Sequence, residues 1–334
     1  MTIGGPVPTI DFHNHYYPPA YLDALRSRPT AVKVGVDAEG NPLLHYPGDY
    51  NIVVRGHRDI EYREQVLADH GVDRQILTLT TPGTHVETLG RALELASLVN
   101  DEFAGVVRKR GDHFGALATL PLNDPQASAR ELERAMKVLG LPGAMLFSNV
   151  NGVPLADARF LPLYEVADEL GAVLYIHPKH PIIGEARTDY WLMPPVGFLM
   201  DTTLAAAHLV FAGIPERFPR IRWALCHLGG TIPYIAERLD RGFHAFKECR
   251  AHIDRPPSEY LKRFYYDTVN FDPAALELAI AFAGPGRIMA GSDYPHQIGS
   301  LASMKRSIDQ IDAPAAVKEG IRGGNALALL SEPE

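Results

Sequence analysis

Short, nearly continuous apolar runs alternate with longer amphipathic stretches along most of this chain. The apolar runs are rich in β-branched and aromatic residues, which is typical of strands buried on both faces. Eight such runs occur, at residues 9–15, 74–80, 114–122, 143–150, 172–178, 221–229, 263–269 and 287–295. The pattern predicts an α/β protein in which eight strands alternate with helices.

The amphipathic stretches at 84–110, 124–138 and 272–284 have the spacing of helices that bury one face. Asp124 and Asp272 are each followed by proline, an arrangement that favours an N-cap residue with proline in the first helical position. The sequence therefore predicts where two of the helices begin.

Eight alternating units favour a (β/α)₈ TIM barrel formed by a single domain over residues 1–334. An open, doubly wound sheet is the alternative, and it is less favoured because no GxGxxG pattern follows the first strand. Residues 31–48 alternate apolar and polar positions around a turn at 37–41, which predicts a small β-hairpin after strand one. We place this insertion at about residues 16–60.

Composition excludes several classes of function. The net charge of −8 and the absence of a basic cluster argue against a nucleic-acid partner. No apolar run is long enough to cross a membrane, and the N-terminus has no basic segment followed by an apolar one, so we expect a cytoplasmic protein. The two cysteines, Cys226 and Cys249, are too few for a disulfide framework and are expected to be reduced, with Cys226 in a buried strand.

Unusual polar residues fall at the ends of the predicted strands. His13 and His15 end the first strand, and residues i and i+2 of a strand point to one face, so their imidazoles can converge. His177 ends the fifth strand, His227 lies in the sixth, and Asp293 lies in the eighth. In a barrel, active-site groups belong at these carboxyl ends.

Each of these residues also has an ordinary explanation. An isolated HxH can be a pair of surface histidines, a lone histidine is more often a hydrogen-bonded core or surface residue, and an aspartate before Tyr-Pro is typical of a turn. These explanations would have to hold at four strand ends together, which disfavours them. Imidazole and carboxylate groups suit a borderline cation such as Zn²⁺, so we expect a metal site at the barrel mouth.

With these residues in view, the chain resembles the amidohydrolase superfamily, and within it the branch around 2-amino-3-carboxymuconate-6-semialdehyde decarboxylase and related aromatic acid decarboxylases. The resemblance extends from residue 9 to about residue 330. It is carried by the segments "DFHNH", "IHP", "CHLGGTIPYIAERLDR", "RPPSEYLKRFYYDT", "GSDYP" and "GNA".

The resemblance implies one divalent metal ion held by His13, His15, His177 and Asp293. Zn²⁺ is the expected ion and Mn²⁺ the alternative. It further implies that His227 acts as the general acid or base and that Asp293 passes a proton to the substrate. Strand four, at 143–150, has no lysine that could bridge a second metal.

Arg238 matches an arginine that in this branch reaches the site of the neighbouring subunit and binds the substrate carboxylate. The resemblance therefore implies a homodimer. The alternative is a solvated helix arginine paired with Glu237 or Asp240.

The resemblance also leaves differences in the predicted substrate pocket. A second arginine expected after strand one aligns near Asn51, and Arg55 and Arg58 are the nearest replacements. The residue after "SDYP" is His296 rather than an aromatic residue, and it is either an extra polar contact in the pocket or an exposed loop residue. Trp191, in a long loop at 177–197, is expected to face the substrate.

Together these features predict a metal-dependent non-oxidative decarboxylase, a C–C lyase acting on an aromatic or conjugated carboxylic acid. A metal-dependent hydrolase or hydratase is the alternative, because the same ligands serve both chemistries. A barrel that only binds an organic acid, or a structural zinc protein, is a third option. It is disfavoured because a closed structural site would give His227 no purpose.

Overall fold

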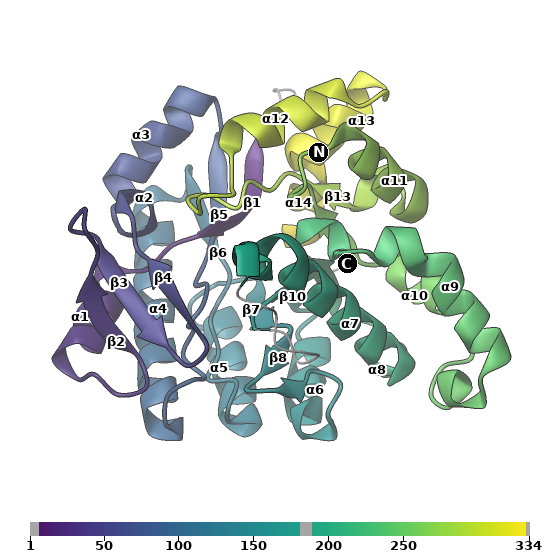
Figure 1. The fold of residues 1–334 in the computed structure, drawn as a ribbon, viewed down its shortest axis with the longest axis horizontal. Coiled ribbons are helices and arrows are strands. Elements are labelled where there is room, and N and C mark those ends of the chain that lie inside the picture. The colour runs from purple at the N-terminus through teal and green to yellow at the C-terminus, as the bar shows by residue number, and fades with distance from the viewer. Residues whose placement is uncertain (1–6, 181–188, 332–334) are drawn as a thin grey trace.

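The computed structural model describes residues 7–180 and 189–331. Parallel strands form two sheets in its interior (Figure 1). One sheet has the order β1-β5-β6, and the other has the order β13-β12-β11-β10-β7. Their bounds are β1 Ile10–His15, β5 Arg74–Thr78, β6 Phe114–Ala116, β7 Gly143–Phe147, β10 Val173–His177, β11 Arg222–Leu225, β12 Tyr265–Asp267 and β13 Ile288–Met289. The prediction of an α/β protein is confirmed.

The two sheets meet at both of their edges. Asn14 at the end of β1 forms a parallel bridge with Tyr294, and Ala118 after β6 forms one with Ala144 in β7. The N–H of Phe12 also donates to the carbonyl of Ala290 at 2.8 Å. Hydrogen bonding therefore continues from each sheet to the other.

The observed strands are shorter than the predicted apolar runs, most clearly the third and the eighth. The third ends at Ala116 and the eighth at Met289, although their apolar runs continue to residues 122 and 295. Beyond β13 the chain leaves extended geometry, because Asp293 has a positive φ of 58°. The N–H groups of Ser292 and Asp293 both donate to one acceptor, the carbonyl of His13. The parallel pairing of β-strands cannot continue through such a turn.

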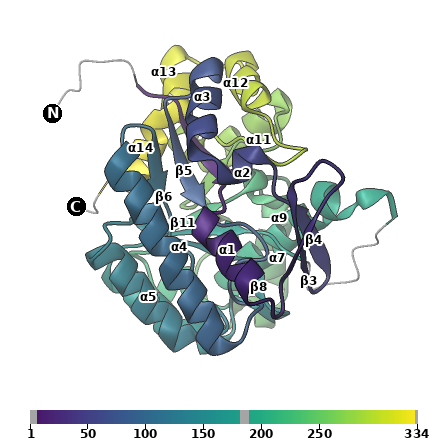
Figure 2. The same ribbon diagram turned by 90° about the vertical axis from the view of Figure 1, so that its left-hand side faces the viewer.

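Helices surround these sheets (Figure 2). Asp124 and Asp272 cap α5 and α11 with their side chains, as predicted, and the predicted helix at 84–110 is observed as α4. The helices are α1 Pro19–Ser27, α2 Arg55–Arg58, α3 Ile60–His70, α4 Leu89–Arg110, α5 Pro125–Lys137, α6 Leu161–Glu169, α7 Phe198–Phe211, α8 Ile214–Arg217, α9 Ile232–Ala245, α10 Pro257–Leu261, α11 Pro273–Ala283, α12 Leu301–Gln310, α13 Ala315–Glu319 and α14 Asn325–Leu330.

A small antiparallel sheet lies at the side of the molecule, near α1 (Figures 1 and 2). Its strands are β2 Lys33–Val36, β3 Pro42–Tyr46 and β4 Asp49–Ile52, in that order. The turn between β2 and β3 is held by Asp37, whose carboxylate accepts from the N–H groups of Glu39 and Asn41. Two further short strands, β8 Asn149–Val150 and β9 Val153–Pro154, pair with each other.

Arg63 on α3 is fully buried and fastens this helix to the end of β1. Its guanidinium donates to Asn14 Oδ1 at 2.7 Å, to Gln75 Oε1 at 2.8 Å and to the carbonyl of Gly56 at 3.0 Å, and it also donates to the carbonyl of His15. A buried cation is tolerated because every donor group has an acceptor.

Within the described residues, no helix is both long and apolar enough to cross a membrane. Cys226 and Cys249 are both free thiols. Cys226 is buried as expected, but it follows β11 rather than lying in the strand.

Candidate functional site

Three histidines and one aspartate meet at the carboxyl ends of the parallel strands. His13 and His15 lie on β1, His177 ends β10, and Asp293 follows β13. One candidate ligand atom from each residue lies within 4.8 Å of the other three, and all four residues are buried. The structure thus brings together the four residues that the sequence predicted as metal ligands.

Two of these histidines use Nδ1 as a donor away from the centre of the cluster. His15 Nδ1 lies 3.1 Å from Thr78 Oγ1, whose own hydroxyl donates to the carbonyl of Asn14. His177 Nδ1 lies 2.7 Å from the carbonyl oxygen of Pro178. Because both partner oxygens can only accept, each imidazole carries its hydrogen on Nδ1 and keeps a lone pair on Nε2.

These lone pairs make the cluster suitable for a cation. His15 Nε2 is 3.2 Å from Asp293 Oδ1, so a nitrogen lone pair faces a carboxylate oxygen. His13 Nε2 is 3.4 Å from the same oxygen, is buried, and has no hydrogen-bond partner among the described residues. Positive charge placed between these atoms would turn repulsion into attraction. Since imidazole and carboxylate ligands suit Zn²⁺ and Mn²⁺, the residues present fit a divalent ion.

Asp267, the last residue of β12, holds two of the histidines in place. Its Oδ2 accepts from His13 Nδ1 at 2.7 Å and from the Tyr175 hydroxyl at 2.6 Å. Its Oδ1 accepts from the backbone N–H groups of His227 at 2.9 Å and Val269 at 2.8 Å. No motif in the sequence predicts a role for this residue. A fully buried carboxylate at the end of an apolar strand was the signal that could have revealed it.

His227 stands beside the cluster rather than in it. Its Nε2 is 3.9 Å from Asp293 Oδ2, and its Nδ1 is 3.1 Å from Cys226 Sγ. Both His227 and Asp293 have positive φ values, 53° and 58°, which non-glycine residues rarely adopt. Such strained positions concentrate at functional sites, where the surrounding structure enforces them.

Burial and local contacts set the protonation of these groups. Burial lowers the pKa of His15 to about 3 and holds the pKa of His177 well below its usual value, so both imidazoles are neutral. Burial raises the pKa of Asp293, but the neighbouring His227 opposes this and the pKa stays well below its usual value, so this carboxylate is ionised. For His227, burial lowers the pKa, whereas Cys226 and Asp293 raise it and prevail.

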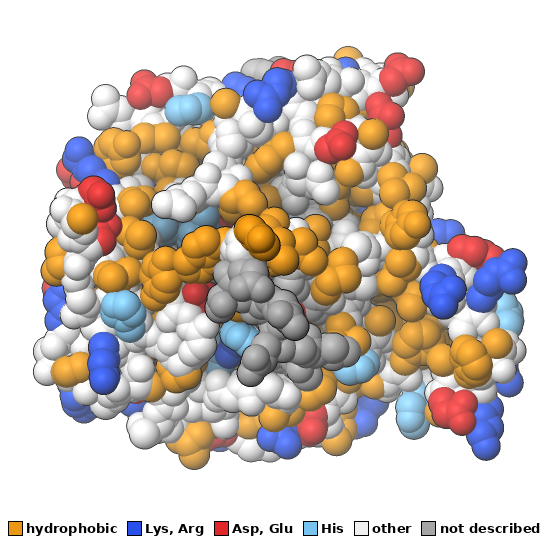
Figure 3. Space-filling view, in the orientation of Figure 1, with side chains coloured by type: hydrophobic (Ala, Val, Ile, Leu, Met, Phe, Trp, Pro, Cys, Tyr) orange, Lys and Arg blue, Asp and Glu red, His pale blue; other side chains and the backbone are white. Residues whose placement is uncertain are grey.

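A cavity of about 700 Å³ opens beside the cluster, with His177, His227 and Asp293 among its lining residues. Much of its wall is apolar, including Trp191 and Phe198. In the described part of the chain, no lysine or arginine lines it. Figure 3 shows hydrophobic side chains gathered near the centre of the face drawn there.

The structure places Trp191 and His296 at this cavity. Trp191 lines it, is 57% exposed, and packs its ring edge-on against Tyr50 with centroids 5.5 Å apart. Of the long loop predicted at 177–197, residues 181–188 lie outside the described residues. His296 also lines the cavity and is only partly exposed, with its ring centroid 4.9 Å from that of His15.

The two predicted arginines lie elsewhere. Arg55 is not among the lining residues, because its guanidinium pairs with Asp59 at 2.8 Å and stacks over Tyr62. Asn51, at the position where the resemblance expects an arginine, does line the cavity. Arg238 is exposed on α9.

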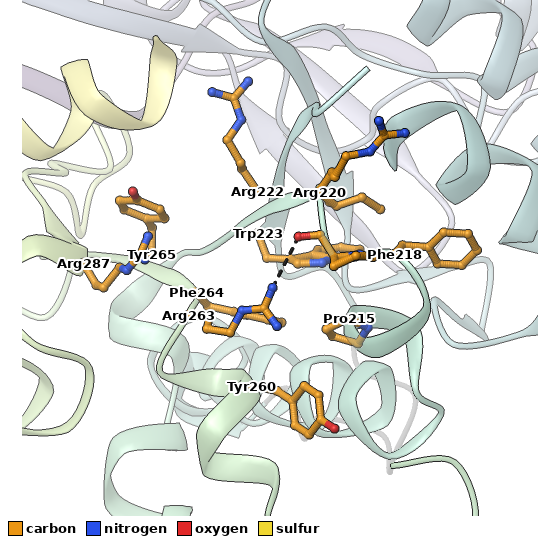
Figure 4. Close-up of a pocket in the computed structure, with 12 residues that line it drawn as sticks. Pro215, Phe218, Arg220, Arg222, Trp223, Tyr260, Arg263, Phe264, Tyr265 and Arg287 are labelled. Atoms are coloured by element: carbon orange, nitrogen blue, oxygen red, sulfur yellow. Dashed lines mark hydrogen bonds between the residues drawn. The ribbon is translucent and has the colours of Figure 1, made fainter. Parts of the chain in front are cut away.

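A second pocket of about 230 Å³ lies at the opposite end of the strands, where β11 and β12 begin (Figure 4). Several arginines line it, but Arg220 pairs with Asp168 and Arg222 donates to the carbonyl of Gly171. Figure 4 shows both of these guanidinium groups turned away from Trp223. This pocket therefore lacks the convergent polar groups of the first cavity.

Comparison with known proteins agrees with this geometry. The family model described as amidohydrolase matches residues 10–331. The chain is 33% identical to 2-amino-3-carboxymuconate-6-semialdehyde decarboxylase of Dictyostelium discoideum over 81% of this chain and 76% of that protein.

Solved structures show the same similarity. The 5-carboxyvanillate decarboxylase of Sphingomonas paucimobilis superposes with a TM-score of 0.87 at 28% identity, covering 98% of this chain and 100% of that chain. The dihydroxybenzoic acid decarboxylase of Polaromonas sp. JS666, solved with bound manganese and an inhibitor, gives 0.81 at 26% identity, covering 97% and 96%. This chain belongs to the amidohydrolase family.

Proposed function

We propose that this protein is a metal-dependent non-oxidative decarboxylase that releases CO₂ from an aromatic or conjugated carboxylic acid. The observation that carries the proposal is the convergence of three imidazoles and one ionised carboxylate beside a largely apolar cavity. The relatives described above are decarboxylases, which favours this reaction over hydrolysis or hydration on the same scaffold.

His13, His15, His177 and Asp293 would hold one divalent metal ion. The donor set suits Zn²⁺, and the manganese of the Polaromonas relative supports Mn²⁺ as well. When bound, the ion supplies a Lewis acid that fixes the substrate and stabilises developing negative charge.

The chain's own residues would move the proton. Loss of CO₂ from a ring requires that the carbon bearing the carboxylate first be protonated, which makes it tetrahedral. Asp293 and His227 lie side by side at the cavity, with His227 Nε2 3.9 Å from Asp293 Oδ2. Because Asp293 is ionised at rest, it would first take a proton from His227, whose pKa is raised, and then pass that proton to the ring carbon. Water would return a proton to His227 before the next turnover. The C–C bond then breaks, CO₂ leaves, and the bonding pair restores the ring.

Arg238 of a second copy would bind the substrate carboxylate, so the active form would be a homodimer. Two observations support this role. The cavity has no cation among its described lining residues. The alternative partners of Arg238 are also engaged elsewhere, because Glu237 pairs with Arg241 and Asp240 accepts from Ser258. An arginine suits this task because it binds carboxylate in a bidentate manner.

We further propose that the chain is one TIM-barrel domain over residues 1–334. The bridges at both edges of the two sheets, together with a family model that matches 10–331 without interruption, support a closed eight-stranded barrel. The small sheet β2–β4 would be an insertion within residues 16–60.

Metal content and CO₂ release test this function together. Purified protein should contain about one metal ion per chain. The double variant His13→Ala, His15→Ala should lose the ion, whereas the control His45→Ala, His70→Ala, which changes two exposed histidines, should keep it. Aromatic acids would then be screened for CO₂ release before and after chelation. Wild-type protein that binds no metal after reconstitution, or a metal-loaded protein that releases acid in a pH-stat but no CO₂, would refute the proposal.

A further inference from the structure

His57 is a buried histidine with no part in the metal cluster or the proposed proton transfer. It lies on α2, is 1% exposed, and lines the cavity. Both of its ring nitrogens are buried without a hydrogen-bond partner among the described residues. Buried polar atoms are nearly always paired in folded proteins, so two unpaired nitrogens on one ring call for a partner that the protein chain does not supply.

His296 lies between His57 and the metal cluster. Its ring centroid is 5.0 Å from that of His57 and 4.9 Å from that of His15. The backbone N–H of His296 donates to the carbonyl of Asp293, but its ring makes no hydrogen bond within the described part of the chain. His57 and His296 therefore form an imidazole pair whose nitrogens are uncommitted.

The relative position of the imidazole pair is fixed by close packing. Helix α2 approaches the loop that carries His296 so tightly that a Cβ on Gly56 would collide with the side chains of Tyr294 and Pro295. Only glycine permits this approach. The two rings are thus held on facing elements rather than meeting by chance on mobile side chains.

The wall near the imidazole pair is polar, and no lysine or arginine is among the described residues that line the cavity. The nearby cation Arg63 lies behind this wall and is already engaged by four acceptors. Asn51 stands where the resemblance expects an arginine, and its amide donates to the Tyr17 hydroxyl at 2.9 Å and to the Thr81 carbonyl at 2.7 Å. The carboxylate of Asp49 also lines the cavity. A second substrate carboxylate in this part of the cavity would lose its hydration without gaining a cation.

An uncharged hydroxyl suits the imidazole pair better than a carboxylate does. Burial lowers the pKa of His57, so its ring is neutral and offers one N–H donor and one acceptor nitrogen. A hydroxyl group both donates and accepts, so it can satisfy an acceptor on one ring and a donor on the other.

We propose that His57 and His296 are specificity-determining residues, which select aromatic acids that carry one carboxylate and an uncharged hydroxyl substituent over dicarboxylic acids and over acids whose hydroxyl is blocked. This inference rests on the proposed function, because it assigns the substrate class of the same cavity. His296 contacts the hydroxyl, and His57 contacts it or holds His296 in the receiving orientation.

Calorimetric titration tests the inference without turnover. Mn²⁺-loaded protein would be titrated with the three isomeric hydroxybenzoates, the matching methoxybenzoates and the benzenedicarboxylates. For the isomer that binds best, wild type should favour hydroxyl over methoxy by about tenfold, the effect of losing one hydrogen bond between neutral groups. His57→Phe and His296→Phe should lose this preference while keeping the metal. His57→Asn, which retains a donor and an acceptor, should recover part of it.

His70→Phe is the matched control, because His70 is exposed on α3. It should keep the wild-type preference. A preference that survives in both His57→Phe and His296→Phe would overturn the inference alone, and so would a wild type that binds dicarboxylates best. A metal-loaded wild type that binds none of the acids and releases no CO₂ would overturn the proposed function together with it.

Discussion

Replacement of Asp267 by asparagine is the sharpest test of how the metal centre is built. The carboxylate accepts two hydrogen bonds on each oxygen, from His13 and Tyr175 on one and from the N–H groups of His227 and Val269 on the other. Asparagine keeps the shape but turns one oxygen into an NH₂ donor. Either His13 and Tyr175, or the N–H groups of His227 and Val269, must then face the new NH₂ group, which is itself a donor.

The orientation of the asparagine amide depends on which of the two donor pairs can become an acceptor. Backbone N–H groups cannot become acceptors, and leaving them unpaired costs about 1–3 kcal/mol each. His13 and the Tyr175 hydroxyl can adapt, since the hydroxyl rotates and the imidazole can move its hydrogen from Nδ1 to Nε2. That shift places a hydrogen on the nitrogen that faces Asp293 and removes the lone pair from the proposed ligand.

The cost should therefore appear in metal affinity. Loss of a partner that orients a metal-binding histidine typically weakens binding about 10–100-fold. Each tenfold step corresponds to about 1.4 kcal/mol. Competition titration with a chromophoric chelator would measure the dissociation constant of Asp267→Asn beside wild type, with the exposed Asp309→Asn as the matched control. If folded Asp267→Asn binds the ion as tightly as wild type, the carboxylate does not set the tautomer of His13 and the reasoning fails.

Three further changes follow from the same structure. His227→Asn should lower kcat by about a hundredfold or more with metal content unchanged, and full activity would exclude His227 from proton transfer. Arg63→Met leaves four buried acceptors unpaired and should lower the free energy of unfolding in urea by about 3 kcal/mol or more, whereas an unchanged midpoint would contradict its anchoring role. Arg238→Ala should raise KM for the acid while Arg241→Ala does not, and equal effects would argue against a special role for Arg238.

The eight strands and the polar residues at their ends could be predicted because their signals are local, and the family resemblance then separated the four expected ligands from His227. A buried parallel strand shows as a short apolar run, and a polar residue at its end is visible without knowing its neighbours. The same signal existed for Asp267, but its importance comes from a contact with His13, 254 residues away. Without that contact, one buried acid is indistinguishable from a capping or structural one.

The residues that line the cavity were harder to predict, because a small rotation of a helix changes which of its side chains face the cavity. Arg55 and His57 are two residues apart on α2, yet His57 lines the cavity and Arg55 turns to Asp59. The resemblance predicts an arginine near this point, and no local pattern marks His57 as the residue that lines the cavity. Which face of a four-residue helix meets a cavity depends on its packing against the Tyr294–Pro295 turn, and no periodic pattern records that.

The placement of the cluster has a consequence for the order in which the protein matures. Its residues span the chain from His13 to Asp293, so Asp293 is synthesised long after the first two histidines. A nascent chain that has reached His177 contains the three histidines of the cluster but not its carboxylate, Asp293. The proposed ion-binding set is therefore complete only after Asp293 has left the ribosome and the two sheets have met at Asn14 and Tyr294. Metal acquisition is in this sense a late step that reports on completed folding.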